Sequence, residues 1–147
     1  MKTRFFILLL LCLSIGLAGC TKGLPSSLVF DGTTLEQSKK KRGPRETFDT
    51  YMYRGENGQV TVANITEEDV INSYVSLMKL GLKSKGMEID TFDPEQPLII
   101  AHNDKLEIVL TVGEVDNQER PVYYTHRRND PDLSTEEVIS ALQNMSE

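Results

Sequence analysis

Apolar and polar residues alternate in two segments near the middle of the chain, and apolar residues then recur at helical spacing. Residues 47–53 and 59–63 are rich in aromatic, β-branched and threonine residues, and a short connection containing Asn-Gly joins them. Two such runs with this connection are typical of a β-hairpin. Thr66 follows as a candidate N-cap, with three acids after it, and predicts the start of a long helix. Gly86 predicts its end.

The long helix carries a wide apolar stripe that predicts a buried face. Gly81 interrupts this helix, where glycine costs about 1 kcal/mol relative to alanine. It indicates either close packing against the sheet or an earlier end of the helix. The residues of the stripe are Val70, Ile71, Tyr74, Val75, Leu77 and Met78.

The C-terminal half predicts three more strands and a short helix. The strands are residues 98–102, 105–112 and 121–127. In the second strand the even-numbered residues are all apolar, which predicts one buried face and one face that is at least half exposed. Ser134 and Glu137 have the spacing of a capping box and predict the start of the last helix. Its inward-facing residues are Val138, Ile139, Leu142 and Met145.

These elements predict an α+β fold with the order β-β-α-β-β-β-α. Adjacent strands with short connections pair antiparallel, and helices gather on one face of such a sheet. We therefore expect a small antiparallel sheet of four to five strands, with one long helix packed on one face and a short C-terminal helix.

The first twenty residues differ from the rest of the chain. Met1 to Arg4 form a basic start, residues 5–13 are apolar, and small residues precede Cys20. This order is typical of a secretory signal, and the apolar run is shorter than the ~20 residues of a transmembrane helix. The segment closes with Leu17-Ala18-Gly19-Cys20.

These four residues resemble the lipobox of bacterial lipoprotein precursors. The resemblance implies that a diacylglyceryl group is attached to Cys20 and that the chain is cleaved between Gly19 and Cys20. Each buried methylene contributes ~0.8 kcal/mol, so two or more acyl chains hold a protein almost permanently at a membrane. Thr21, where an aspartate would imply retention at the inner membrane, implies an outer-membrane anchor facing the periplasm in a Gram-negative host. In a Gram-positive host the anchor would lie in the plasma membrane.

The chain divides into a signal peptide at 1–19, a lipidated flexible tether at 20–45 and an α+β domain at 46–147. The tether has little periodicity and is rich in Gly, Pro, Ser and charge. Its apolar residues 28–30 predict either a short strand or a segment that docks on the domain. Residues 33–41 predict a weak helix.

Charge is spread unevenly along the chain, whose formal net charge is −6. The tether is basic and the acids concentrate in the domain, which argues against nucleic acid as a partner. Near a membrane, each basic residue of the tether would gain ~1 kcal/mol from anionic lipid headgroups; the alternative is a solvated linker. The basic run is Lys39, Lys40, Lys41 and Arg42.

Motifs for catalysis or for cofactor binding are absent from the sequence. The chain has no GxSxG, Walker A or GxGxxG pattern. Cys12 lies in the signal and Cys20 at the lipid site, so we expect no disulfide. His102 and His126 are the only histidines, and zinc sites use three or four protein ligands. We therefore expect no catalytic residue, no metal and no cofactor.

Tyrosines and arginines provide a candidate partner-binding face. Tyrosine combines a large apolar area with a polar tip and is common at interfaces. Alternatively, it favours strands and covers the edge of a core. Tyr51 and Tyr53 fall on one face of their strand, whereas Tyr123 and Tyr124 fall on opposite faces of theirs. The candidate residues are Tyr51, Tyr53, Tyr123, Tyr124, Arg127 and Arg128.

Together these features predict a non-catalytic cell-envelope lipoprotein whose domain binds an envelope component or an assembly or secretion machine. Two alternatives are a small hydrolase or ligand-binding enzyme acting on envelope polymers and a surface-exposed adhesin-like lipoprotein. A deep cleft lined by carboxylates or by His102 would favour the enzyme. Exposure to protease on intact cells would favour the adhesin.

Overall fold

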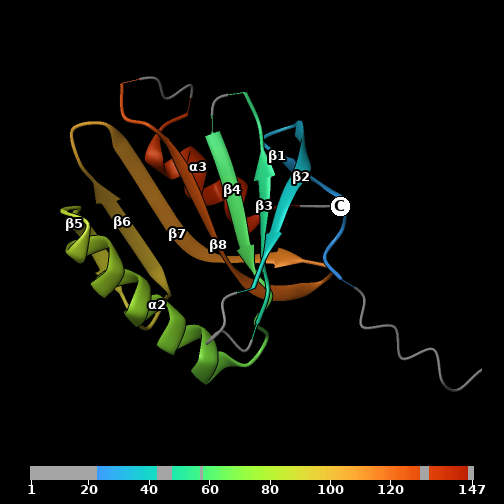
Figure 1. The fold of residues 1–147 in the computed structure, drawn as a ribbon, viewed down its shortest axis with the longest axis horizontal. Helices are drawn as coiled ribbons and strands as arrows, with labels where there is room; N and C mark the ends of the chain where they lie inside the picture. Colours follow the sequence, from blue (N-terminus) through green and yellow to red (C-terminus); the bar gives the residue numbers. More distant parts are fainter. Residues whose placement is uncertain (1–22, 43–47, 57, 130–132, 146–147) are drawn as a thin grey trace, which may run out of the picture.

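Eight antiparallel strands form one continuous sheet in the computed structural model, which describes residues 23–42, 48–56, 58–129 and 133–145 (Figure 1). The strand order is β1-β2-β3-β4-β8-β7-β6-β5. Two helices complete the described part, α2 (Glu68–Ser84) and α3 (Thr135–Gln143). The strands are β1 (Ser27–Phe30), β2 (Thr33–Lys41), β3 (Thr50–Arg54), β4 (Gly58–Ala63), β5 (Glu88–Asp93), β6 (Leu98–His102), β7 (Leu106–Val115) and β8 (Gln118–Arg127).

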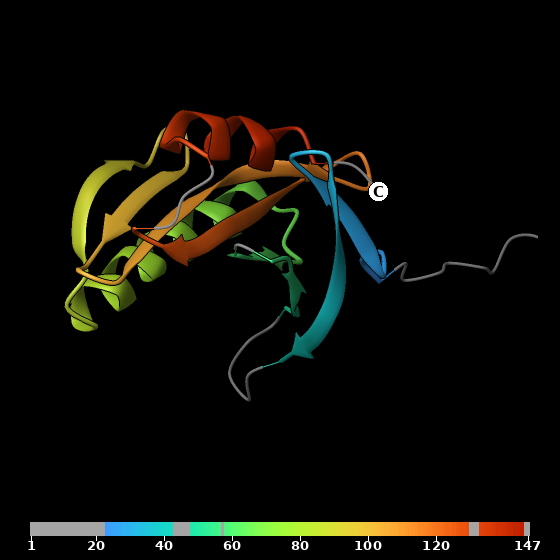
Figure 2. The same cartoon turned by 90° about the horizontal axis from the view of Figure 1, so that it is seen from above.

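The prediction of four to five strands with the helices gathered on one face was wrong. The sheet is eight strands wide, and α2 and α3 pack on opposite faces of it (Figure 2). Three strands account for the extra width. β1 and β2 come from the segment predicted to be a tether, and β5 comes from residues to which no element was assigned.

The β1–β2 hairpin turns at Asp31 and Gly32, whose φ angles are both positive, 46° and 69°. Consecutive positive φ values are typical of a type I′ turn, whose twist matches that of the paired strands. Leu28 on β1 and Leu35 on β2 are buried in the core beneath α3. The prediction of a flexible tether is therefore wrong for residues 23–42, and residues 33–41 form a strand instead of a helix.

The two faces of the sheet bury separate cores, because neighbouring residues of a strand point to opposite faces. On β7, Val109 packs in the core beneath α3, and Leu110 packs in the core beneath α2. The face of β7 that was predicted to be half exposed is covered by α3, and both Val109 and Thr111 on that face are buried. The sheet is therefore the middle layer of three, with α3 on one face and α2 on the other.

α2 begins without a side-chain cap. Its N-cap is Glu67, which makes no capping hydrogen bond, so the prediction of Thr66 as the N-cap was wrong. Ile71 and Val75 face the sheet as predicted. Leu77, which was predicted to face inward, is 66% exposed and points away from the sheet.

α2 ends as the sequence predicts. Gly86 has a φ of 75°, and its amide donates a hydrogen bond to the carbonyl of Lys83, while the Met87 amide donates to that of Leu82. These two bonds form a Schellman motif, which favours glycine at the left-handed position. Leu82 and Met87, which flank the motif, are both buried in the core beneath α2.

α3 has the predicted capping box. The Ser134 hydroxyl accepts a hydrogen bond from the Glu137 amide at 3.3 Å, and the Glu137 carboxylate accepts one from the Ser134 amide at 2.7 Å. Leu142 near its C-terminal end is fully buried. The helix lies directly on β7 at Gly113, where any side chain would overlap the carbonyl oxygen of Leu142.

Candidate functional site

Two histidines and two glutamates form a row across four neighbouring strands. Glu88 of β5 pairs with His102 of β6, His102 with Glu107 of β7, and Glu107 with His126 of β8. Directly paired residues point to the same face of a sheet. We call these four residues the histidine row. The arrangement of two histidines around one glutamate was not predicted, because it depends on the register in which β6, β7 and β8 pair.

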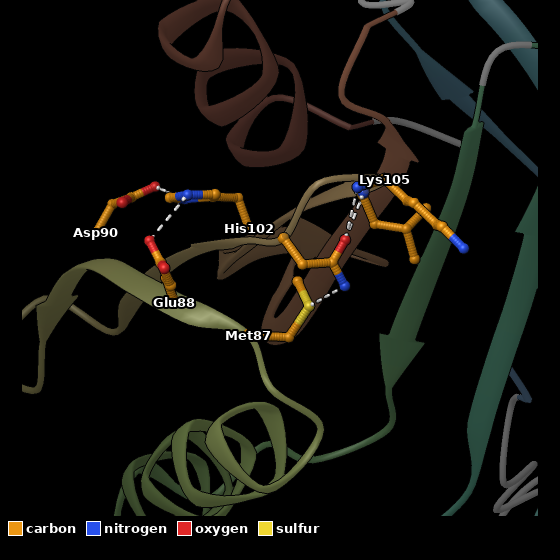
Figure 3. A network of polar contacts seen from close by, with 7 residues as sticks. Met87, Glu88, Asp90, His102 and Lys105 are labelled. Atoms are coloured by element: carbon orange, nitrogen blue, oxygen red, sulfur yellow. Dashed lines mark hydrogen bonds and ion pairs between the residues drawn. The ribbon is translucent and has the colours of Figure 1, made fainter.

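His102 is held by two carboxylates at the β5 edge of the sheet (Figure 3). Its Nδ1 lies 2.6 Å from Oδ2 of Asp90, and its Nε2 lies 3.3 Å from Oε2 of Glu88. The next residue, Asn103, shapes the β6–β7 turn, where its side-chain oxygen accepts hydrogen bonds from the amides of Lys105 and Leu106. Both ring nitrogens of His102 therefore have partners. These two contacts link β6 to the edge strand β5.

His126 has a different environment. It is buried, its Nε2 lies 4.0 Å from Oε1 of Glu107, and its Nδ1 has no hydrogen-bond partner. Glu107 itself accepts a hydrogen bond from the Thr135 hydroxyl at the start of α3, at 3.1 Å. A buried polar atom without a partner is costly in a folded protein. Nδ1 of His126 is therefore an unsatisfied polar atom just beneath the surface of the sheet.

His126 lines an open cavity of about 530 Å³ at this end of the sheet, together with Leu106, Gln59 and Arg127. A second cavity of about 560 Å³ adjoins it on the α3 side, and the two share residues of the β3–β4 turn, including Arg54 and Glu56. Ligand sites in proteins are commonly of this size. We call the pair of cavities the hollow. Its apolar wall consists of Phe30, Leu35, Tyr124 and Leu133.

The predicted tyrosines do not form one exposed face. Tyr51, Tyr53 and Tyr124 are buried in the core beneath α3, whereas Tyr123 is half-buried against the core beneath α2. The placement on strand faces is as predicted. Of the three, Tyr124 reaches the hollow, where its ring stacks on Phe30 with centroids 5.0 Å apart.

Tyr53 ties the N-terminal segment to the sheet. Its hydroxyl donates a hydrogen bond to the carbonyl oxygen of Pro25 at 2.7 Å. Burial raises the pKa of Tyr53 to about 12. The residue is therefore a structural donor that stays protonated over the ordinary pH range.

The arginines of the predicted face are exposed at the end of β8 and just after it. Arg127 lines the hollow, whereas Arg128 lies outside it, with its amide bonded to the carbonyl of Lys105. Of the six candidate residues, the structure thus brings only Tyr124 and Arg127 to the hollow, one to each of its two cavities. The sequence did not single out the other polar residues there, Arg54, Glu56 and Gln59, because their shared location depends on how β3, β4 and β8 pair.

The basic run lies on β2 at the end of the sheet opposite the hollow. Lys40 points to the α3 face, where its Nζ lies 2.6 Å from Oδ2 of Asp49 and 5.2 Å from the ring centre of Tyr51. The hydrogen bond with Asp49 raises the pKa of Lys40. Lys39 and Lys41 point to the other face and are exposed, and within the described ranges neither has an ion pair.

A buried arginine was missed by the sequence reasoning. Arg120 donates hydrogen bonds to the side-chain oxygens of Gln118, at 2.8 Å, and Asn64. Burial lowers its pKa. The sequence does not signal this burial, because Arg120 precedes a proline in a polar stretch. Arg120 is buried because β8 begins two residues before it, at Gln118.

The lipid site and the cleavage site, Cys20 and Gly19, lie outside the described residues, which begin at Gly23. Among the residues that are described, no helix has the length and apolar character needed to cross a bilayer. The same part of the chain contains no group of three or more His, Cys, Asp or Glu side chains arranged to hold a metal ion.

Comparisons with known proteins give no further information about this site. No protein-family profile, no curated protein and no solved structure matches the chain.

Proposed function

We propose that the protein is a lipid-anchored, non-catalytic component of the bacterial cell envelope, and that its domain binds a partner protein through the hollow. The observation that carries the proposal is the position of the hollow relative to the start of the folded chain. Gly23 lies against the hydroxyl of Tyr51, since a side-chain carbon there would be 3.6 Å from that oxygen. Tyr51 and Arg54 lie toward opposite ends of β3. An anchor at Cys20 would therefore leave the hollow open to the aqueous compartment.

The lining of the hollow favours a peptide segment as the bound element. Phe30, Leu35 and Tyr124 offer apolar and aromatic contacts, which supply much of the affinity at protein interfaces. Arg54 and Arg127 at the rim favour a segment that also carries an acid, because arginine pairs with carboxylates in two-pronged geometry. His126 and Gln59 add polar groups to the lining.

The anchor is tested by Cys20→Ala in the full chain. In cells fed an alkyne-tagged fatty acid, the wild-type protein should take up the tag and fractionate with membranes. The Cys20→Ala protein should remain uncleaved and untagged. A substituted protein that is still tagged would contradict lipidation at Cys20.

The hollow is tested by site-specific photo-crosslinking in living cells. A photoreactive residue at Thr34, which lines the hollow and is exposed, should give a discrete crosslinked band. The same residue at Glu95, in the exposed β5–β6 turn, should give none. Arg54→Glu combined with the photoreactive Thr34 position should weaken the band. Equal bands from both positions would contradict a specific site.

A second candidate, a small hydrolase acting on envelope polymers, is favoured by one observation. His126 lines a cavity with the Glu107 carboxylate 4.0 Å from its Nε2, and a histidine beside a carboxylate is a pairing that general bases use. Cell-wall fragments incubated with wild-type protein and with His126→Gln would distinguish the two functions. Turnover that depends on His126 would replace the binding proposal.

A further inference from the structure

The described part of the chain begins close to the proposed lipid site. Only Thr21 and Lys22 separate Cys20 from Gly23, so three Cα–Cα steps of 3.8 Å limit the distance between Cys20 and Gly23 to about 11 Å. Leu24, the next residue, is already buried in the core beneath α3. This part of the argument rests on the proposed anchor at Cys20. A link this short does not let the domain rotate freely, unlike the long tether that the sequence predicts.

Gly23 lies beside the basic run. A side-chain carbon at Gly23 would lie 3.6 Å from the hydroxyl of Tyr51, and Lys40 lies over the ring of the same tyrosine. Lys39, Lys41 and Arg42 adjoin Lys40 and are exposed. Asp49 neutralises part of the charge, because it lies 2.6 Å from Lys40 and 4.0 Å from Arg42. Lys39 and Lys41, on the other face, have no ion pair within the described residues.

We infer that the basic run on β2 rests on the anionic headgroups of the membrane that holds Cys20, which fixes the orientation of the domain. The short link keeps these side chains near the membrane surface, and charges act over about 8–10 Å at physiological ionic strength. The lysines and Arg42 attract anionic lipid within that range. The hollow, at the other end of β3, then faces away from the membrane.

Acidic groups at the same end of the sheet sharpen this orientation. The first turn of α2 carries Glu68 and Asp69, and the tip of the β7–β8 hairpin carries Asp116 in its turn and the paired strand residues Glu114 and Glu119. Anionic headgroups repel both groups. Tilting the β2 side of the sheet toward the membrane brings the lysines closer, whereas tilting the α2 side or the β7–β8 side toward it brings these acids closer, so the first tilt is favoured.

The test uses the full, lipidated protein reconstituted into phosphatidylcholine vesicles with or without phosphatidylglycerol. A fluorophore is attached at Ser38→Cys on β2 or at Asp104→Cys in the β6–β7 turn, both of which are exposed positions. A quencher is attached to lipid headgroups. With phosphatidylglycerol, the label at position 38 should be quenched several-fold more than the label at position 104. Equal quenching would overturn the inference.

Charge reversal supplies the matched control. Lys39→Glu with Lys41→Glu should abolish the difference in quenching, as should omission of phosphatidylglycerol. Lys83→Glu with Lys85→Glu makes the same change in net charge near the C-terminal end of α2, beside β5 at the far edge of the sheet (Figure 1), and should leave the difference intact. Equal losses from both pairs would overturn the inference. Lys39→Gln with Lys41→Gln repeats the test with a milder change.

Failure of the anchor has its own signature. If Cys20 is not lipidated, the protein does not float with vesicles, and its thiol reacts with the fluorophore in the otherwise unsubstituted chain. If the protein floats and Cys20 is unreactive but quenching does not depend on position, the anchor stands and the orientation is wrong.

Discussion

Gly113 of β7 and Leu142 of α3 lie so close that a methyl group on the glycine would overlap the carbonyl oxygen of the leucine. Nothing at this contact can yield cheaply, because the obstructing atom belongs to the backbone of a helix. Gly113→Ala should therefore destabilise the protein by about 1–3 kcal/mol, the usual cost of overpacking. Urea unfolding followed by circular dichroism would measure the loss. A variant as stable as the wild type would show that α3 sits farther from β7.

Gly81 in α2 is the matched opposite case. A side-chain carbon there meets no atom within 4 Å, and the helix continues beyond it to Ser84. Of the two explanations that the sequence left, close packing and an early helix end, neither applies. Gly81→Ala should stabilise the protein by up to about 1 kcal/mol, because alanine has the higher helix propensity. The same urea titration would show it, and a destabilised variant would contradict the open space beside Gly81.

Leu28 tests whether the N-terminal segment belongs to the core. It is fully buried beneath α3, so Leu28→Ala should cost about 2–5 kcal/mol. Val29, the next residue, is half-exposed and lies outside both buried clusters. Val29→Ala should therefore cost clearly less. Equal melting temperatures for the two variants would instead support the prediction that this segment is a flexible tether.

Tyr53 gives the protein a pH-dependent contribution to stability at alkaline pH. Its pKa is raised from 10.0 to about 12 in the folded chain, chiefly by burial. A pKa that is higher in the folded than in the unfolded chain stabilises the folded state at pH values below the unfolded pKa. This contribution is lost as the pH rises from about 10 towards 12. In a spectroscopic titration of tyrosinate, the last phase should vanish in Tyr53→Phe. That variant should also lose about 0.5–1.5 kcal/mol through the bond to Pro25. Titration of every tyrosine near its ordinary pKa would contradict the burial.

Glu137 makes the opposite contribution in acid. The hydrogen bond from the Ser134 amide lowers the pKa of its carboxyl group. A pKa that is lower in the folded than in the unfolded chain stabilises the folded state at pH values above the unfolded pKa. This contribution is lost as the pH falls through the folded pKa. Glu137→Gln should lower the melting temperature at neutral pH and make little difference in acid below the ordinary glutamate pKa. Glu136→Gln, one residue earlier and outside the capping box, should change it less. A pH-independent effect would contradict the capping role.

Sequence signals were sufficient for those elements whose structure is determined by a few neighbouring residues. β6 has the predicted bounds, the capping box at Ser134 is present, and α2 ends at the predicted glycine. β2 was missed because Leu35 is its only apolar residue and its lysines and glutamate favour helix. It becomes a strand because β1 and β3 pair with it on both sides, and such tertiary pairing outweighs local propensity.

β5 was missed for a different reason. A register shift between Ile89 and Thr91 breaks the alternation of apolar and polar residues, and alternation is the signal by which strands are recognised. The histidine row and the hollow could not be predicted at all. Both depend on β8 pairing with β4 and β7, and the sequence does not reveal that the last strand enters the middle of the sheet.

That late insertion affects how the chain folds as it is made. The first four strands can pair in order as they emerge, since each lies beside its predecessor. The outer side of β4 must then wait until β8, the last strand of the sheet, has been synthesised. During this interval β4 exposes unpaired backbone groups beside Val60 and Val62, the kind of edge that recruits a foreign strand. The growing chain thus has a built-in period of vulnerability to mispairing, which closes only when its final hairpin arrives.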